Sequence, residues 1–315
     1  MDTLTKPPVE RIFCAFSLVM TLGWMRAGVD PALSLSMCAL HLALAGILLI
    51  LPPAKKGPWP VLAGRQFLPF GLWALAWAEI GWLRRLEPFT AQDLQVQAWD
   101  RALFGLLPHD HLARWLPWSW LNEAMDLTYL SYYLLILGPV ALLAWRRRER
   151  LAEHTQLLMG TYLLCFTVYL FWPVLGPREW AAAGGALAGD PAPGLGARMM
   201  EALFRAGDAK GTAFPSSHCA ASLAAALATW RSWGPVAGRL CLAWALLIAL
   251  ATVYTGNHYA IDALAGLALA LAVWVLHESL AHAAGWAASL ERGLLGSAAV
   301  TVTAQMGTSS KEETP

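Results

Sequence analysis

Long apolar runs separated by short polar connectors dominate the hydrophobic pattern of this 315-residue chain. A helix that crosses the hydrocarbon core of a bilayer needs about 20 predominantly apolar residues. Runs of that length predict about eight transmembrane helices, near residues 10–28, 33–52, 66–83, 121–145, 155–175, 216–233, 237–255 and 258–277. The predicted fold is therefore all-α, a polytopic helical bundle in a membrane.

The segments between and after these runs differ from them in composition. The stretch containing Trp99-Asp100-Arg101 is polar and rich in tryptophan, which predicts an interfacial helix and turn too mixed to span. Residues 177–214 are rich in Gly, Ala and Pro and predict a loop. We expect three regions: an N-terminal transmembrane hairpin (1–65), a core with six spans (66–277) and a partly disordered tail (278–315).

The composition of the chain supports a membrane protein and gives no sign of some classes of partner. Hydrophobic residues make up 57% of the chain and charged residues 14%, against about a quarter in soluble domains. The formal net charge of +1 gives no reason to expect nucleic acid as a partner. The five cysteines have no metal-ligand spacing and are expected to be buried free thiols. We expect neither a metal nor a cofactor, and the oligomeric state stays open.

The distribution of basic residues predicts an orientation. Eight spans place both termini on the same side, together with the Arg146–Arg150 cluster in a short loop. Such clusters mark the cytoplasmic side. The 177–214 loop, His218 and His258 then face the extracytoplasmic side, for which the cell inner membrane is the expected location. Five arginines fall outside on the same count: Arg26, Arg84, Arg85, Arg101 and Arg114.

Ionisable residues at the edges of the apolar runs carry the candidate chemistry. His258 is followed four residues later by Asp262, so a helix would place imidazole and carboxylate on one face. Pro215-Ser216-Ser217-His218 opens the sixth expected span, and Pro215 suits the first helical turn. The free amides of that turn, with the two serine hydroxyls, would form an anion cradle.

Together these residues are suited to phosphoryl transfer. Arg178 can bind a phosphate oxygen through its guanidinium fork. His258, held in one tautomer by Asp262, can attack phosphorus, while His218 passes a proton to the leaving group. Lys210 and Asn257 are further substrate-binding candidates. Each piece alone also has an ordinary structural explanation, such as a helix start or a membrane boundary.

Other polar residues in the expected spans are interpreted as structural or left open. Glu79 and Asp126 could each line a polar cavity, and His41 is interpreted as a hydrogen-bonded packing residue. Four tyrosines are also interpreted as packing residues: Tyr132, Tyr133, Tyr162 and Tyr169.

These motifs resemble the type-2 phosphatidic acid phosphatase superfamily, which also includes vanadium haloperoxidases. Its pattern is a Lys and an Arg-Pro in one motif, then Pro-Ser-Gly-His, then Ser-Arg followed by a His and an Asp four residues on. The resemblance covers about residues 66–277 and implies His258 as nucleophile and His218 as acid and base. The matching positions are Pro215, Ser216, His218, His258 and Asp262, with Ser217 where Gly is usual.

The departures from that pattern point to one branch of the superfamily. If Arg178 is the first-motif Arg, Phe171 stands at the Lys position, Glu179 replaces the Pro, and Thr252 stands at the third-motif Arg. Two of three phosphate-binding cations are then missing. This reduced pattern resembles the inositol phosphorylceramide synthases and their bacterial relatives.

The sequence therefore predicts a membrane enzyme that acts on a lipid phosphate or phospholipid through a phosphohistidine, with transfer of a phospho-headgroup to an alcohol as one outcome. Two alternatives remain. One is a plain lipid phosphate phosphatase acting on phosphatidic acid or an isoprenoid phosphate. The other is a transporter or scaffold without catalysis, which the missing cations keep open.

Overall fold

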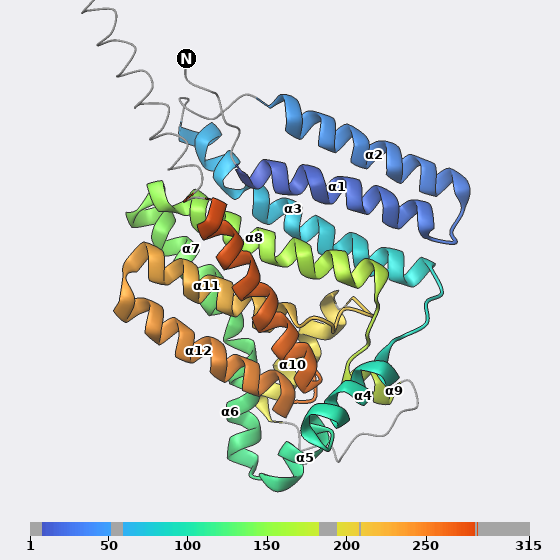
Figure 1. The fold of residues 1–315 in the computed structure, drawn as a ribbon, viewed down its shortest axis with the longest axis vertical. Coiled ribbons are helices and arrows are strands. Elements are labelled where there is room, and N and C mark those ends of the chain that lie inside the picture. The colour runs from blue at the N-terminus through green and yellow to red at the C-terminus, as the bar shows by residue number, and fades with distance from the viewer. Residues whose placement is uncertain (1–7, 52–58, 183–193, 208, 281, 283–315) are drawn as a thin grey trace, which may run out of the picture. The chain divides into compact units, whose positions relative to one another are not determined.

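The computed structural model describes residues 8–51, 59–182, 194–207, 209–280 and 282. Within these residues the fold is all-α, with twelve labelled helices and one further helix (Figure 1). They are α1 (Pro8–Arg26), α2 (Pro31–Ile50), α3 (Trp59–Leu86), α4 (Asp93–Phe104), α5 (Pro108–Trp115), α6 (Ser119–Leu130), α7 (Tyr132–Arg146), α8 (Arg148–Phe171), α9 (Pro177–Ala182), α10 (Leu195–Gly207), α11 (Ser217–Trp233), α12 (Pro235–Tyr254) and the last helix, Ala260–Leu280.

The chain divides into a unit of residues 1–271 and a second unit of residues 272–315. In the second unit the structure describes the end of the last helix and His282, so the expected disordered tail lies almost wholly outside the described residues. The contacts and the cavity described below belong to the first unit.

Four helical segments of the described chain are long and apolar enough to cross a membrane: α2, Ser119–Arg146, α12 and Ala260–Leu280. These four segments confirm the prediction of an all-α, multi-pass membrane protein. The full set of eight spans stays a prediction. The other expected spans coincide with α1, α3, α8 and α11. Most residues of α8 and α11 are buried against other helices, so these two helices need not present apolar residues to lipid.

Helix α11 forms the centre of the bundle. It packs against α12, α8 and α7, and Figure 1 shows it between α8 and α12. Its buried face is rich in alanine, and small residues allow helix backbones to approach closely. The last helix also approaches closely, because a Cβ at Gly266 would lie 2.3 Å from the Ser216 carbonyl oxygen. Glycine at 266 therefore lets the last helix reach the start of α11.

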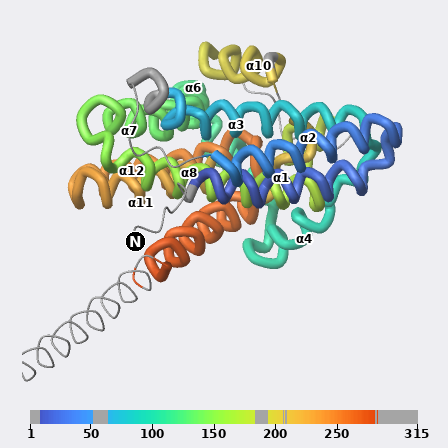
Figure 2. The backbone as a smooth tube through the Cα atoms, turned by 90° about the horizontal axis from the view of Figure 1, so that it is seen from above, coloured from blue at the N-terminus to red at the C-terminus, as the bar shows by residue number. Residues whose placement is uncertain are grey.

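A polar cluster joins the N-terminal hairpin to α3. Helices α1 and α2 pack side by side (Figure 2), and α1 also packs on α8 and α3. Glu79 accepts a hydrogen bond from the Trp24 indole at 2.6 Å and lies 2.7 Å from His41 Nε2. Glu79 and His41 are thus partners of each other. The domain boundary at residue 65 stays a prediction.

The span expected over residues 121–145 coincides with the candidate span Ser119–Arg146, and within it the helix is interrupted at Ser131, between α6 and α7. The Ser131 hydroxyl donates to the Thr128 carbonyl at 2.6 Å and accepts from the Trp244 indole at 2.7 Å. A side chain that competes for helical backbone groups in this way commonly bends a helix. Tyr129 and Tyr132 lie on either side of this interruption.

The loop expected over residues 177–214 also needs correction, because its described part contains α9 and α10. Helix α10 is amphipathic: Met200, Leu203 and Phe204 recur at helical spacing, while Glu201 and Arg205 are exposed. The Gly- and Ala-rich composition hid this periodicity. The helix predicted around Trp99-Asp100-Arg101 is confirmed as α4, whereas its interfacial location stays a prediction.

Candidate active site

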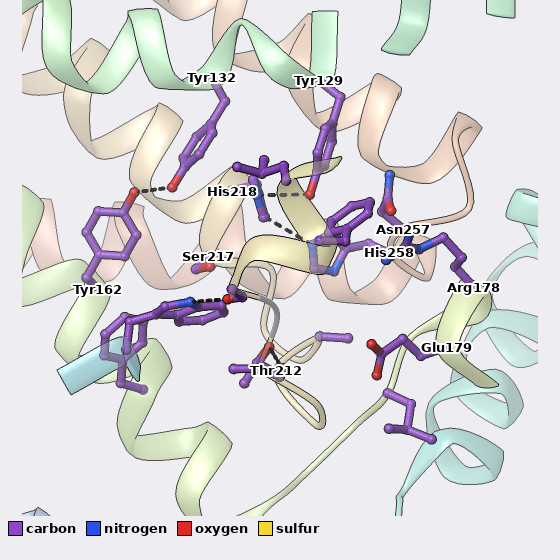
Figure 3. A pocket seen from close by; sticks show the side chains of 18 of the residues that line it. Tyr129, Tyr132, Tyr162, Arg178, Glu179, Thr212, Ser217, His218, Asn257 and His258 are labelled. Atoms are coloured by element: carbon purple, nitrogen blue, oxygen red, sulfur yellow. Dashed lines mark hydrogen bonds between the residues drawn. The ribbon is translucent and has the colours of Figure 1, made fainter. Parts of the chain in front are cut away.

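A cavity of about 300 Å³ lies where three distant segments of the first unit meet (Figure 3). Helix α11 contributes His218, the turn after α12 contributes His258, and α9 contributes Arg178. Ser217 and Asn257 also line the cavity. Much of the remaining wall is aromatic: Trp73, Trp77, Tyr129, Tyr132, Tyr133, Tyr162, Phe166 and Phe204.

The start of α11 is held by side chains that use its first amides. Ser216 is the N-cap, and its hydroxyl accepts the Cys219 N–H at 3.3 Å. The Ser217 N–H donates to the Tyr169 hydroxyl at 3.1 Å, and that hydroxyl donates to the Pro215 carbonyl at 2.8 Å. Pro215 therefore precedes the helix instead of occupying its first turn. Two amides of the expected anion cradle already have partners.

The two candidate serines are placed differently with respect to the cavity. Ser216 is fully buried and is absent from the cavity wall, whereas Ser217 contributes to that wall. The N-cap position explains the difference, because a cap hydroxyl turns back toward the helix amides. A phosphate contact by Ser217 is compatible with this geometry, and one by Ser216 has no support from it.

His258 lies in a tight turn between α12 and the last helix. Its N–H and that of Asn257 both donate to the Thr252 carbonyl, at 3.0 and 3.1 Å. Gly256 adopts a left-handed conformation with φ of 68°, which favours glycine. The Gly256 carbonyl also accepts the Arg178 N–H at 3.0 Å, so the His258 turn and the Arg178 helix are joined directly.

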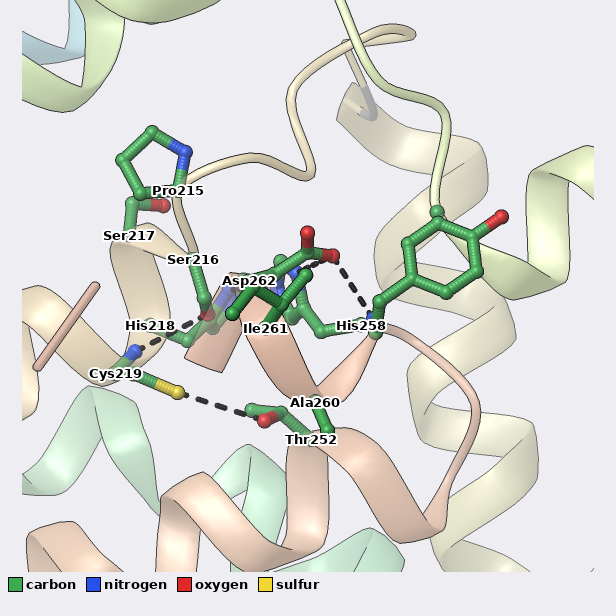
Figure 4. A network of polar contacts seen from close by, with 12 residues as sticks. Pro215, Ser216, Ser217, His218, Cys219, Thr252, His258, Ala260, Ile261 and Asp262 are labelled. Atoms are coloured by element: carbon green, nitrogen blue, oxygen red, sulfur yellow. Dashed lines mark hydrogen bonds and ion pairs between the residues drawn. The ribbon is translucent and has the colours of Figure 1, made fainter. Parts of the chain in front are cut away.

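Asp262 lies behind His258 (Figure 4). Its Oδ2 atom is 3.6 Å from His258 Nδ1. This distance is short enough for an ion pair but too long for a hydrogen bond. The carboxylate is fully buried, and Oδ2 also accepts the Tyr259 N–H at 2.9 Å. Because Nδ1 faces Asp262, the opposite nitrogen, Nε2, is the one available to the cavity.

The two histidines face each other at the cavity. His258 Nε2 lies 3.4 Å from His218 Nδ1. On its other side, His218 Nε2 lies 3.0 Å from the Tyr129 hydroxyl, and the Tyr132 ring packs at a centroid distance of 4.5 Å. Tyr132, which the sequence suggested was a packing residue, thus lines the cavity, as do Tyr133 and Tyr162.

Helix α4 supports the segment that precedes Arg178 and the segment that follows His258 through two buried carboxylates. Asp93 accepts the N–H groups of Leu175 and Gly176, both at 2.9 Å, and the Tyr259 hydroxyl at 2.9 Å. Asp100 accepts the N–H groups of Ala260 and Ile261, at 3.1 and 2.8 Å. These two amides belong to the first turn of the last helix, which needs external acceptors. Sequence reasoning missed both roles.

Two opposing effects act on the pKa values of these two carboxyl groups. Burial raises the pKa of the Asp93 and Asp100 carboxyls, while their hydrogen bonds to backbone N–H groups act in the opposite direction. Burial also lowers the pKa of the neighbouring His109 to about 4, so this imidazole is neutral near pH 7. His109 contacts Tyr259 edge-on at 5.1 Å. Both carboxylates keep their backbone hydrogen bonds to the two segments despite the cost of burial.

Arg178 is the one Lys or Arg in the described wall of the cavity. Its guanidinium lies over the Phe204 ring of α10, 3.4 Å from the centroid. Lys210 is exposed and is absent from that wall, although Ala209 and Thr212 contribute to it. Asp126, another open candidate, packs against Gly196 and is likewise absent from the wall.

Two positions that depart from the expected motif pattern, Phe171 and Thr252, lie outside the described cavity wall, whereas a third, Glu179, lines the cavity. Thr252 is fully buried, and its hydroxyl donates to the Ala249 carbonyl at 2.8 Å. Phe171 is partly exposed under the Arg26 guanidinium and outside the described cavity wall. Phosphate binding through side-chain charge would therefore fall to Arg178.

No metal-ligand cluster of three or more His, Cys, Asp or Glu is present in the part of the chain that the structure describes. The five cysteines are free thiols, four of them buried. A reaction independent of metals and cofactors stays a prediction.

Comparison with known proteins identifies the family. A relative from Dictyostelium discoideum, a PA-phosphatase related-family protein, is 28% identical over 166 residues, which cover 46% of this chain and 30% of the relative. The chain thus matches less than a third of that protein's length. No solved structure matches the chain. A profile of the PAP2 superfamily matches residues 94–276, which is more than half of the sequence and includes His218 and His258. The chain therefore belongs to the PAP2 superfamily.

Proposed function

We propose that this protein is an integral-membrane enzyme that cleaves a lipid-linked phosphate through a phosphohistidine on His258. The observation that carries the proposal is the pair of histidines, with His258 Nε2 and His218 Nδ1 3.4 Å apart at the cavity. Asp262 behind His258 and Arg178 in the same wall supply orientation and positive charge. Family membership supports a lipid phosphate as the substrate class.

The first step follows from the orientation of the two rings. The lone pair of His258 Nε2 attacks phosphorus, and the bond from phosphorus to the leaving oxygen breaks. His218, in its protonated form, gives the Nδ1 proton to that oxygen, so a neutral alcohol departs. Asp262 stabilises the positive charge that develops on the His258 ring, and Arg178 stabilises charge on the phosphoryl oxygens.

The second step returns the enzyme to its starting state. His218 Nδ1, now unprotonated, takes a proton from a water or alcohol whose oxygen attacks phosphorus. The bond between phosphorus and His258 Nε2 breaks, and the imidazole regains its lone pair. Water gives inorganic phosphate when the donor is a monoester, whereas an alcohol gives a new phosphate ester.

Transfer to an alcohol is a second candidate outcome, favoured by the reduced charge of the cavity. With Phe171 and Thr252 in place of cations, Arg178 is the one Lys or Arg in the described cavity wall, which also contains Glu179. One cation matches the single negative charge of a phosphodiester better than the dianion of a monoester. The outer segment with Arg198, Arg205 and Lys210 would border an acceptor site, and a well-oriented acceptor can outcompete water. The inositolphosphotransferase-like branch remains part of this proposal.

We further propose the membrane arrangement predicted from the sequence, with about eight spans, a six-span core over residues 66–277 and the cavity on the extracytoplasmic side of the cell inner membrane. The Arg146–Arg150 cluster between α7 and α8 supports this orientation.

Replacement of the proposed nucleophile tests the chemistry. His258→Ala should lower turnover of the lipid phosphate by about 10³-fold or more, because water cannot take the place of the attacking imidazole. Asp262→Asn should lower it less, through loss of the charge that orients the ring. His111→Ala, outside the described cavity wall, is the control and should keep full activity. A His258→Ala enzyme within a few-fold of the native rate would contradict the proposal.

The choice between hydrolysis and transfer is tested with two donors. The purified protein receives phosphatidic acid in one reaction and a glycerophospholipid diester in another, each with inositol or a lipid alcohol present. Transfer predicts a headgroup-exchanged product from the diester and slow release of phosphate from the monoester. Rapid phosphate release from phosphatidic acid, with no exchanged product, would decide for a phosphatase.

The orientation is tested by labelling single cysteines in a variant that lacks the native five. A cysteine at the exposed position Glu201 of α10 should react with an impermeant thiol reagent in intact cells. A cysteine at the exposed position Arg148, the first residue of α8, should react only after lysis. The reverse pattern would show that the cavity faces the cytoplasm.

A further inference from the structure

The Tyr129 hydroxyl occupies the one side of the His218 ring that the mechanism above does not use. It lies 3.0 Å from His218 Nε2, whereas Nδ1 of the same ring faces His258. Figure 3 shows Tyr129 reaching down from α6 to His218, with Tyr132 beside it. The two nitrogens of His218 therefore have separate neighbours, and only one of them borders the attacking imidazole.

Tyr129 is held firmly in this position. Its side chain is 2% exposed and packs in a cluster with Met200 and Ala251. Its ring lies over His218 at a centroid distance of 4.8 Å and contacts Phe204, the residue that also covers Arg178. A buried phenol hydroxyl needs a hydrogen-bond partner, and His218 Nε2 is within reach of it.

The chemistry assigned to His218 needs one ring nitrogen to give and take a proton, while the other nitrogen keeps its own proton. A neutral imidazole carries its proton on either nitrogen, and the neighbour of one nitrogen decides which. When the Tyr129 oxygen accepts a hydrogen bond from Nε2–H, that proton stays on Nε2. Nδ1, facing His258, is then free to cycle between its protonated and unprotonated forms.

We propose that Tyr129 is a positioning residue that reserves His218 Nδ1 for proton transfer; this inference rests on the proposed function. In the first step the imidazolium donates Nε2–H to the Tyr129 oxygen and gives its Nδ1 proton to the leaving oxygen. In the second step Nδ1 takes a proton from the attacking water or alcohol, and Nε2–H is retained throughout. The Tyr129 hydroxyl takes the same part toward His218 as Asp262 takes toward His258.

The proposal makes the effect of Tyr129 depend on the leaving group. An alkoxide leaving group needs a proton from His218, whereas a 4-nitrophenolate leaves without one. Tyr129→Phe should lower kcat/KM for an alkyl phosphate lipid by about 10–100-fold, a part of the 10²–10⁴-fold that general acid catalysis typically contributes. It should lower kcat/KM for a 4-nitrophenyl phosphate by less than about 3-fold. Because both substrates are measured on one preparation, their ratio does not depend on the folded fraction.

Tyr132→Phe is the matched control. Its ring also packs on His218, but its hydroxyl pairs with that of Tyr162 at 2.6 Å. Whatever its effect on overall rate, it should leave the ratio between the two substrates unchanged. His218→Ala should change the ratio in the same direction as Tyr129→Phe, and more strongly.

The outcomes separate this inference from the proposed function. Equal losses on both substrates in Tyr129→Phe, or no loss on either, would overturn the role of Tyr129 while leaving the phosphohistidine mechanism intact. Native-like activity of His258→Ala would instead overturn the mechanism itself. A ratio changed equally by Tyr132→Phe would assign the effect to packing around His218.

Discussion

The need to satisfy backbone amides in buried turns governs this structure. The Arg178 and His258 segments are irregular at the points where they approach each other, and unpaired buried N–H groups there would each cost about 1–3 kcal/mol. Asp93 and Asp100 of α4 accept four of these N–H groups, and the Thr252 carbonyl accepts two more. The placement of the candidate catalytic groups follows from where these acceptors lie.

The same arrangement prepares the site for chemistry before substrate binds. Gly176 has φ of 88°, and a Cβ there would lie 2.8 Å from the Asn257 carbonyl oxygen, so glycine lets the two turns touch. Tyr169 fixes the start of α11 from the opposite side through its hydroxyl. Donors and charges that are fixed in advance need no reorganisation when charge develops in the transition state. Helix α4 thus supports the cavity through its buried carboxylates, although none of its residues lines the described cavity wall.

The sequence predicted the groups with distinctive spacing and missed those that depend on tertiary contacts. The His258–Asp262 interval and the string ending at His218 identified residues that the structure brings to one cavity. Tyr129 carried no signal, because a tyrosine in an apolar run is usually a packing residue, and its partner His218 is 89 residues away in the sequence. Ser216 and Ser217 could not be distinguished without knowing which of them caps α11.

The central claim is a covalent phosphate on His258, and trapping it is the most direct measurement. Native enzyme and the His218→Ala variant are mixed with a 4-nitrophenyl phosphate, quenched with base within milliseconds to seconds, and digested for mass spectrometry. In the variant the first step needs no acid, but the second lacks its base, so phosphohistidine at His258 should accumulate above the native level. Rapid release of nitrophenol with no phosphate on His258, or with phosphate on another residue, would contradict the account.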